Sequence, residues 1–242
     1  MTTWIALAAL LLVSTVTAVA ADPSPMQARE RTSAGDLLID PINHSALHFE
    51  FGGKQFYVDP AGTANWASMP KADAIFITHE HRDHLDPQTI STIRKAGTVI
   101  IASAPAGKAA GFGDLIKPGE TKQVLGITVE AIPAYNVSAD RLKFHPKERG
   151  DVGYLFTFGG KRVYVAGDTE GTPEMRALKN IDIAFIPINL PYTMPPAEAA
   201  AAVRAFKPKV LYPYHQGKSD PAEMKKLLAD SPEIEVRVLP LP

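Results

Sequence analysis

Three of the chain's seven histidines fall within one short stretch, Thr78-His79-Glu80-His81-Arg82-Asp83-His84-Leu85-Asp86. The stretch directly follows the apolar run Ala74–Ile77, which is typical of a buried strand. Alternate residues of an extended segment point to one side, about 6.6 Å apart, so His79 and His81 can converge on one cation. Asp83 and His84 come after the turn and can face a second cation. Imidazole and carboxylate are ligands that zinc-type ions prefer, and the stretch therefore predicts a metal site at a strand end. The alternative is a polar loop in which the aspartates only cap a helix.

The amino-acid composition excludes several kinds of site and partner. The 242 residues include no cysteine, which excludes disulfides, thiolate zinc sites, iron–sulfur clusters and cysteine nucleophiles. Any metal must then be held by imidazole and carboxylate. With 25 basic and 26 acidic residues the net charge is −1, so nothing favours a nucleic-acid partner, and we expect a small-molecule substrate. The sequence predicts no oligomeric state.

The first twenty residues have the composition of a secretory signal peptide. They contain no Asp, Glu, Lys or Arg, and they end in the small residues Ala18-Val19-Ala20. Cleavage there would give an exported protein, periplasmic or secreted, without stable membrane association. An uncleaved membrane anchor is the alternative, since residues 4–20 are at the short limit for a spanning helix. Residues 21–36 are polar and without periodicity, so we expect an N-terminal arm followed by one domain, 37–242.

Short strand-like runs dominate the rest of the chain. Hairpins come first and strand–helix alternation follows, and this order occurs twice. It predicts an α/β fold in which two mixed β-sheets pack face to face with helices outside, a four-layer αβ/βα sandwich. The expected strands are Leu37–Ile42, Ala46–Phe51, Gln55–Val58, Ala74–Ile77, Thr98–Ala102, Thr121–Ile132 with a turn at Gly126, Gly153–Phe158, Arg162–Ala166, Ile181–Ile186, Val210–Tyr214 and Ile234–Leu239, and the expected helices are Pro87–Ala96, Pro196–Phe206 and Pro221–Ala229.

Two later segments also carry possible ligands directly after apolar strands. Asp168 follows Val165-Ala166-Gly167, and His215 follows Leu211-Tyr212-Pro213-Tyr214. Alone, Asp168 reads as a turn residue and His215 as a buried core histidine. A metal pair needs more ligands than one loop supplies, and these two side chains would complete the set.

The motif His-x-His-x-Asp-His, here His79, His81, Asp83 and His84, resembles the signature of the metallo-β-lactamase superfamily. The resemblance implies the sandwich fold, a bridging role for Asp168 between two metals, and a second-metal role for His215. Asn43-His44-Ser45 and Val58-Asp59-Pro60 resemble the opening hairpin of the branch that includes ascorbate-6-phosphate lactonase and N-acyl-phosphatidylethanolamine phospholipase D.

The third histidine of the first metal departs from the superfamily's pattern. Asn136 stands about where that histidine is commonly found, and His145 is the remaining histidine of the region. We expect His145 to be the ligand. The alternatives are two histidines plus water, or a site loaded with one metal.

The resemblance implies a metal-dependent hydrolase with two divalent ions, zinc first and manganese or iron as alternatives. A hydroxide activated by both ions would attack an ester, lactone or phosphodiester. Asp83 would orient the hydroxide, His44 could face the crevice, and Tyr192 could stabilise an oxyanion, although surface and packing roles are open for both. The alternative functions are a non-catalytic exported metal-binding or scaffold protein and an iron-dependent oxidoreductase of the same fold.

Overall fold

The computed structural model describes residues 28–238. The predicted signal peptide and the first residues of the predicted arm, 21–27, lie outside this range. Between residues 28 and 238, no helix has the length and apolar character needed to cross a membrane.

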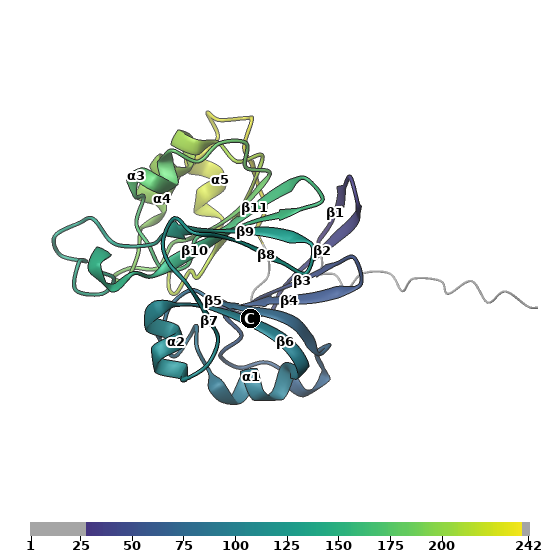
Figure 1. Ribbon diagram of the computed structural model, residues 1–242. Helices are drawn as coiled ribbons and strands as arrows, with labels where there is room; N and C mark the ends of the chain where they lie inside the picture. Colours follow the sequence, from purple (N-terminus) through teal and green to yellow (C-terminus); the bar gives the residue numbers. More distant parts are fainter. Residues whose placement is uncertain (1–27, 239–242) are drawn as a thin grey trace, which may run out of the picture.

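Two mixed sheets of seven strands each form the centre of the molecule (Figure 1). In each sheet four strands pair antiparallel and the later ones pair parallel. In spatial order the first sheet contains β1 (Ala28–Thr32), β2 (Gly35–Pro41), β3 (Leu47–Phe51), β4 (Lys54–Val58), β5 (Ala72–Ile77), β6 (Arg94–Ser103) and β7 (Asp114–Ile116). The second contains β14 (Glu235–Val236), β13 (Val210–Tyr214), β12 (Ile183–Pro187), β11 (Lys161–Val165), β10 (Val152–Phe158), β9 (Ile127–Pro133) and β8 (Thr121–Val124).

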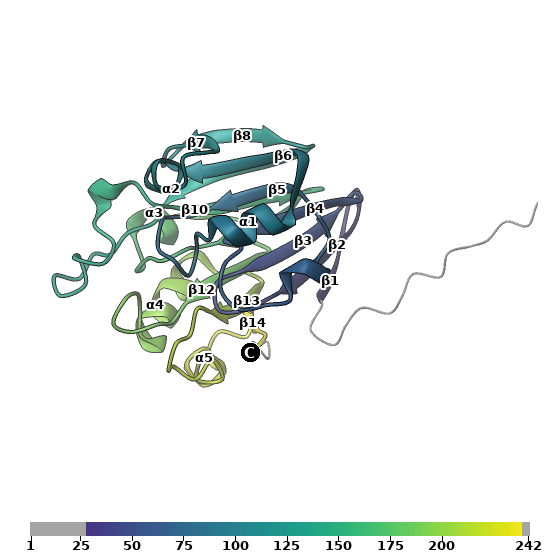
Figure 2. The ribbon, with the colours of Figure 1, turned by 90° about the horizontal axis from the view of Figure 1, so that it is seen from below.

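Helices cover the outer face of each sheet (Figures 1 and 2). Those over the first sheet are α1 (Pro87–Ile93) and α2 (Ala104–Ala110), with the 3₁₀ turn η1 (Trp66–Ser68) beside them. Those over the second are α3 (Pro173–Arg176), α4 (Pro196–Phe206) and α5 (Glu223–Leu227). The predicted four-layer sandwich is confirmed.

Strand β5 shows why the apolar run before the histidines is continuous. Ala74 and Phe76 face the core between the sheets, whereas Ile75 and Ile77 pack under the helices. A strand covered on both faces needs apolar side chains at successive positions. The chain turns polar where β5 ends, and β11 and β13 end in the same way, so their following residues collect at one edge of the sandwich.

Some expectations about individual elements are wrong. Residues 28–36 are not an irregular arm, because β1 and the start of β2 pair as a hairpin at the sheet edge. Helix α1 ends at Ile93, since Arg94 already begins β6. The C-terminal elements α5 and β14 are shorter than expected. The short elements α2, β7 and α3 were not predicted.

Candidate metal centre

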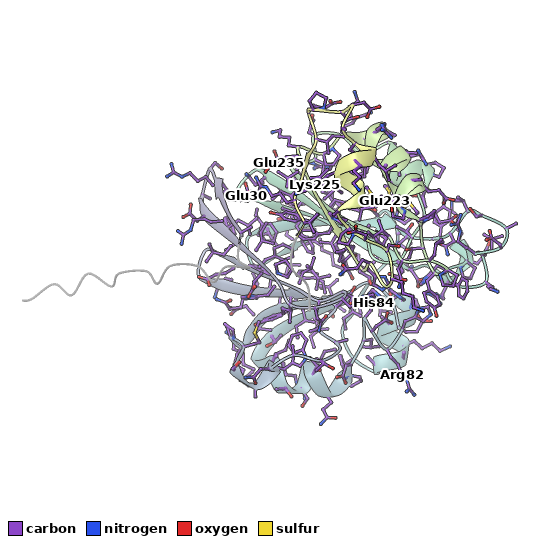
Figure 3. All side chains as sticks on the ribbon, turned by 180° about the vertical axis from the view of Figure 1, so that it is seen from behind. Glu30, Arg82, His84, Glu223, Lys225 and Glu235 are labelled. Carbon is purple, nitrogen blue, oxygen red and sulfur yellow. The ribbon has the colours of Figure 1, made fainter. Side chains whose placement is uncertain are left out.

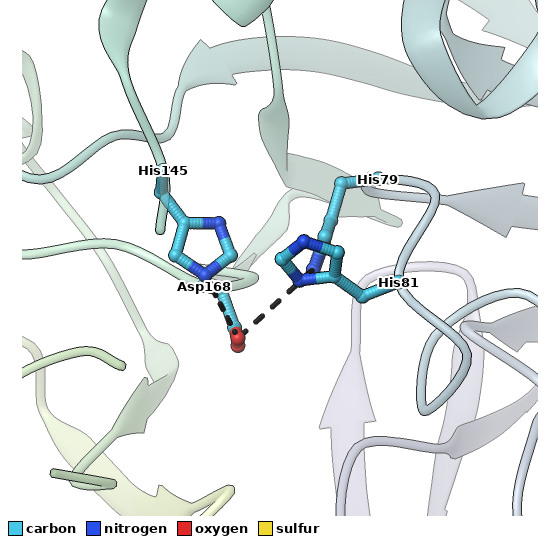
Figure 4. A group of neighbouring side chains, drawn as sticks. All are labelled: His79, His81, His145 and Asp168. Atoms are coloured by element: carbon cyan, nitrogen blue, oxygen red, sulfur yellow. Dashed lines mark hydrogen bonds and ion pairs between the residues drawn. The ribbon is translucent and has the colours of Figure 1, made fainter. Parts of the chain in front are cut away.

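Imidazoles that follow β5 meet one from the connection between β9 and β10. His79 Nε2 lies 3.1 Å from Nδ1 of His81. On the other side, Nε2 of His145 lies 3.4 Å from Oδ2 of Asp168, which is 4.0 Å from Nε2 of His79 (Figure 4). These four side chains point one ligand atom each at a common point, with all the atoms within 4.8 Å of one another.

A second group of donors adjoins the first. His84 Nε2 lies 3.1 Å from Nε2 of His215, which in turn lies 3.3 Å from Oδ2 of Asp83. Asp168 Oδ1 is 3.4 Å from His84 Nε2 and 3.3 Å from His215 Nε2. The two oxygens of Asp168 therefore face different groups, Oδ2 the first and Oδ1 the second. This is the position that a bridging carboxylate requires.

Two ligand atoms of the cluster lack the partners that buried polar atoms normally have. His145 Nε2 and Asp168 Oδ1 are buried and form no hydrogen bond. Because an unpaired buried polar atom is costly, each such atom needs an explanation. Both are aimed into the cluster, and imidazole nitrogen with carboxylate oxygen is a ligand set that suits zinc-type ions. The residues present therefore fit a pair of bound divalent cations.

The orientation of His84 is fixed from behind by Asp59. Its Nδ1 lies 2.8 Å from Oδ2 of Asp59, so Nε2 is turned toward the cluster. Asp59 also accepts hydrogen bonds from the backbone N–H and the hydroxyl of Thr78, at 2.8 and 2.7 Å. In the same loop Arg82 is exposed, whereas His84 is fully buried where the two halves meet (Figure 3).

A glycine brings Asp168 into the cluster. Gly167 has a φ of +65°, and a Cβ there would lie 3.1 Å from Cβ of Thr78 and from the carbonyl oxygen of Val152. Other residues would be strained by both the backbone conformation and the contact. The two sheets can therefore approach closely enough for Asp168 to lie beside the histidines of the first sheet.

His145, and not Asn136, joins the cluster. The side-chain amide of Asn136 instead donates hydrogen bonds to the carbonyl oxygens of Arg141, at 3.0 Å, and Tyr192, at 2.7 Å. His145 Nδ1 lies 3.4 Å from Oδ2 of Asp151, which leaves Nε2 pointing at Asp168. The geometry favours the expected choice of His145.

Burial and neighbouring charges shift the pKa values of three side chains in the cluster. Burial by itself would raise the pKa of Asp168, but His215 and His84 hold that pKa well below its ordinary value. Burial would lower the pKa of His84, but Asp168 and Asp59 raise it well above the ordinary value. Burial together with His84 keeps the pKa of His79 well below the ordinary value. A bound divalent cation would replace the protons held by these side chains, because an imidazole that binds a metal must be neutral.

A cavity of about 480 Å³ opens onto these donors. His44 lies on its wall, with its ring centroid 3.8 Å from that of His215 and its Nε2 3.8 Å from Oδ2 of Asp83. Burial and the neighbouring His215 lower the pKa of His44 to about 4, so its ring is neutral. Tyr192 also lines the cavity, where it is 46% exposed and its ring meets that of Phe144 edge to face. Both residues therefore form part of the cavity wall.

Four residues at the site had no assigned role in the sequence interpretation. Asp59 lies within a segment quoted only for its resemblance, and no spacing rule points to it. The guanidinium of Arg149 donates to Nε2 of His81 at 3.1 Å and also binds Asp151. Phe144 and Asn189 line the cavity, and the only signal for either was its closeness to a candidate residue.

Comparison with known proteins agrees with this geometry. The family model of the β-lactamase superfamily domain matches residues 38–215. A UPF0173 metal-dependent hydrolase of Thermococcus onnurineus is 32% identical over 215 residues, covering 80% of this chain and 92% of the relative. A candidate metal-dependent hydrolase from Parabacteroides distasonis has a solved structure with a TM-score of 0.86 and 46% identity, covering 89% of this chain and 99% of that one. The solved structure of Igni18, a metallo hydrolase from Ignicoccus hospitalis, has a TM-score of 0.70 and 25% identity. It covers 84% of this chain and 94% of that one.

The chain therefore belongs to the β-lactamase superfamily. Within it, the chain is a member of the family of UPF0173 metal-dependent hydrolases, and so an enzyme. The narrower resemblance to the ascorbate-6-phosphate lactonase and phospholipase D branch stays a prediction.

Proposed function

We propose that this enzyme is a hydrolase that uses two adjacent divalent cations to cleave an ester, lactone or phosphodiester bond of a small molecule. The observation that carries the proposal is the position of Asp168, whose two oxygens face two separate groups of donors at the floor of one cavity. A carboxylate in this position supports two bound cations rather than one bound cation.

The donors divide between two positions. His79 Nε2, His81 Nδ1 and His145 Nε2 would hold one cation, and Asp83, His84 and His215 would hold the other. Asp168 would contact both and so set their separation. When bound, the two ions would acidify a water molecule and polarise the oxygen of the bond to be cleaved. We propose zinc first, with manganese or iron as alternatives that the same donors accept.

The chain's own residues would orient the reacting groups. The Asp83 carboxylate is half exposed at the cavity, where it can accept a hydrogen bond from the attacking water and so orient it. The backbone carbonyl of Asp83 accepts a hydrogen bond from the Ser45 hydroxyl, which fixes the loop. His44, neutral beside Asp83, can accept a hydrogen bond from the substrate. The Tyr192 hydroxyl stands at the mouth as a possible donor to a developing oxyanion.

The test is turnover by the purified chain. We expect hydrolysis on a panel of esters, lactones and phosphodiesters in the presence of zinc, manganese or iron, and loss of that hydrolysis on adding a chelator. Tight metal binding with no turnover across the panel would favour the scaffold function. Oxidation of a substrate by the iron-loaded protein, without hydrolysis, would favour the oxidoreductase.

Export, inferred from residues 1–20, is proposed separately and is tested by finding the N-terminus of the mature protein.

Elemental analysis tests the choice of His145. The variant His145→Ala should lose one of two metals per chain, because it removes a donor that no nearby side chain replaces. The matched variant Asn136→Ala should retain both, since its amide contacts only backbone carbonyls. Two metals retained in His145→Ala would instead make this histidine a substrate contact.

A further inference from the structure

Exposed apolar side chains gather on two loops that also contribute residues to the cavity wall. Six large hydrophobic residues of the described chain are exposed, and four of them lie on two loops beside the metal centre. Val137 and Leu142 belong to the connection between β9 and β10, which extends away from the sheets in Figure 1. Leu190 and Tyr192 belong to the connection after β12. Scattered exposed apolar residues need no explanation, but a group beside a cavity marks a binding surface.

Two rings join this surface to the cavity itself. Phe144 and Tyr192 both line the cavity, and their rings meet edge to face with centroids 5.0 Å apart. The cavity floor is formed by the donors His81, His145 and Asp168. The rings and these donors therefore line one and the same cavity. Pockets for small molecules commonly combine such apolar walls with a few polar groups at one end.

The two loops are held in place without a ligand. The Asn136 amide bonds the carbonyl of Arg141 on one loop and that of Tyr192 on the other. Thr193 Oγ1 accepts from the backbone N–H of Asn189 at 3.0 Å and so closes the second loop. Because the backbone of both loops is already held in place, less conformational entropy is lost when an apolar group binds against the rings.

We propose that Phe144 and Tyr192 form a subsite for the hydrophobic portion of the substrate, an alkyl or aryl acyl group whose carboxyl end lies at the metal centre. The proposal rests on the proposed function, since it places the reacting carbonyl at the donors. It assigns the substrate class as small hydrophobic carboxylic esters or lactones. A second copy of the chain on the same surface is the competing occupant, and it would leave the cavity floor uncontacted.

Calorimetric titration of the zinc-loaded full chain with acetate, hexanoate and phenylacetate tests the subsite without requiring turnover. Each methylene that becomes buried should raise affinity about fourfold. Hexanoate and phenylacetate should therefore bind roughly tenfold or more tightly than acetate. Phe144→Ala and Tyr192→Ala should each reduce that preference to about threefold, and Phe144→Ala should leave the acetate affinity unchanged.

Matched variants separate the ring from other effects. Tyr192→Phe keeps the ring and should keep the preference, and Leu125→Ala removes an exposed leucine outside this cavity and should change nothing. Equal affinity for the three carboxylates would overturn the subsite, as would sedimentation showing that Phe144→Ala disrupts a dimer with no change in carboxylate preference. If the preference appears but no panel substrate is hydrolysed, the proposed reaction fails and the subsite stands. If panel substrates are hydrolysed but the preference is absent, the subsite fails and the proposed reaction stands.

Discussion

At the scale of single residues, Asp59 shows how the centre is supported from outside the set of donors. It is fully buried, and its backbone lies in the left-handed region with a φ of 48°. For an aspartate this conformation is uncommon and costs free energy. The residue nevertheless receives three hydrogen bonds or close polar contacts, from Thr78 twice and from His84 once. A carboxylate behind a metal-binding imidazole fixes its tautomer and raises its basicity.

Replacing Asp59 by Asn should therefore weaken metal binding about 10- to 100-fold. The amide oxygen can still accept from Thr78, so the loop should fold, but the negative charge behind His84 is lost. Competition with a chromophoric chelator measures the zinc affinity. Asp73→Asn is the matched control, because Asp73 accepts a backbone hydrogen bond from Gln55 at 2.9 Å outside the centre. Unchanged affinity in Asp59→Asn would show that His84 is oriented by other contacts.

The donors themselves could be named from the sequence, whereas their supports could not. His79, Asp168 and His215 each follow an apolar strand, and the strands of both sheets end at the same edge, so the structure brings them together. Asp59 contacts Thr78 and His84, and Arg149 contacts His81, across a long stretch of chain, and no local pattern encodes such contacts. His145 was an intermediate case. Its residue type indicated a ligand, but the sequence did not predict the loop conformation that brings it to the cluster.

At the scale of elements, the long connection between β9 and β10 is anchored by one buried ion pair. Glu170, 1% exposed, pairs with the Arg141 guanidinium and accepts the backbone N–H groups of Val137 and Ser138, both at 2.6 Å. Arg141 also contacts Glu198 of α4 at 2.8 Å, but that carboxylate is half exposed. Since Glu170 follows Asp168 by two residues, the same turn holds both Asp168 and the loop that carries His145.

Glu170→Gln should lower the free energy of unfolding by roughly 3 kcal/mol, because it leaves the buried Arg141 without the buried one of its two carboxylate partners. Glu198→Gln should cost less than about 1 kcal/mol, as for other solvent-screened pairs. Urea denaturation of the metal-free proteins measures both values. We also expect limited proteolysis to cut the connection faster in Glu170→Gln. Equal losses in the two variants would contradict the anchoring role.

Elements with strong local signals were predicted closely, and those defined by tertiary contacts were not. The bounds expected for Pro196–Phe206 and Val210–Tyr214 match α4 and β13 in full. Strand β1 has alternating partial burial and is stabilised mainly by pairing with β2, which a polar sequence does not reveal. Helix α2 follows β6 without a loop, so the apolar end of the strand obscured the helix start at Ser103.

At the scale of the whole molecule, the β1–β2 hairpin ties the first sheet to the second, away from the metal centre. Glu30 of β1 accepts hydrogen bonds from Lys161 and from Arg237, both at 2.7 Å, and both partners belong to the side of the second sheet. Glu30 and Glu235 lie near each other and apart from His84 in Figure 3. Burial alone would raise the pKa of Glu30, but Lys161 and Arg237 lower it below the ordinary value of 4.5.

Because this pKa is lowered in the folded protein, Glu30 stabilises the fold above pH 4.5, and that contribution is lost as the pH falls through the folded value. Glu30→Gln should cost about 1.5 kcal/mol at pH 7, and its difference from the wild type should shrink below pH 4.5. Urea midpoints of the metal-free proteins across this range measure the effect. Asp36→Asn, in a more exposed pair with Arg29, should cost about 0.5 kcal/mol at most. A difference independent of pH would assign the loss to packing.

The metal centre joins the same two halves at the opposite edge. His79, His81 and His84 follow the first sheet, whereas Asp168 and His215 follow strands of the second. A cation held by both can form its full set of contacts only in the folded protein, so binding and folding are linked. At a free zinc concentration 100 times the Kd, the stabilisation is about 2.7 kcal/mol, which raises the Tm by roughly 5–10 °C in a domain of this size.

Chelation should therefore lower the Tm of the zinc-loaded protein by that amount, as measured by calorimetry. Asp168→Asn should lose most of the response, because it removes the one carboxylate that both groups share. His48→Gln should keep it, since His48 is the one histidine placed elsewhere, 2.6 Å from Oε1 of Gln55 and stacked on Tyr57. A response that survives in Asp168→Asn but disappears in His48→Gln would place the cation outside the cluster, and the two sheets would then be held together by their apolar core alone.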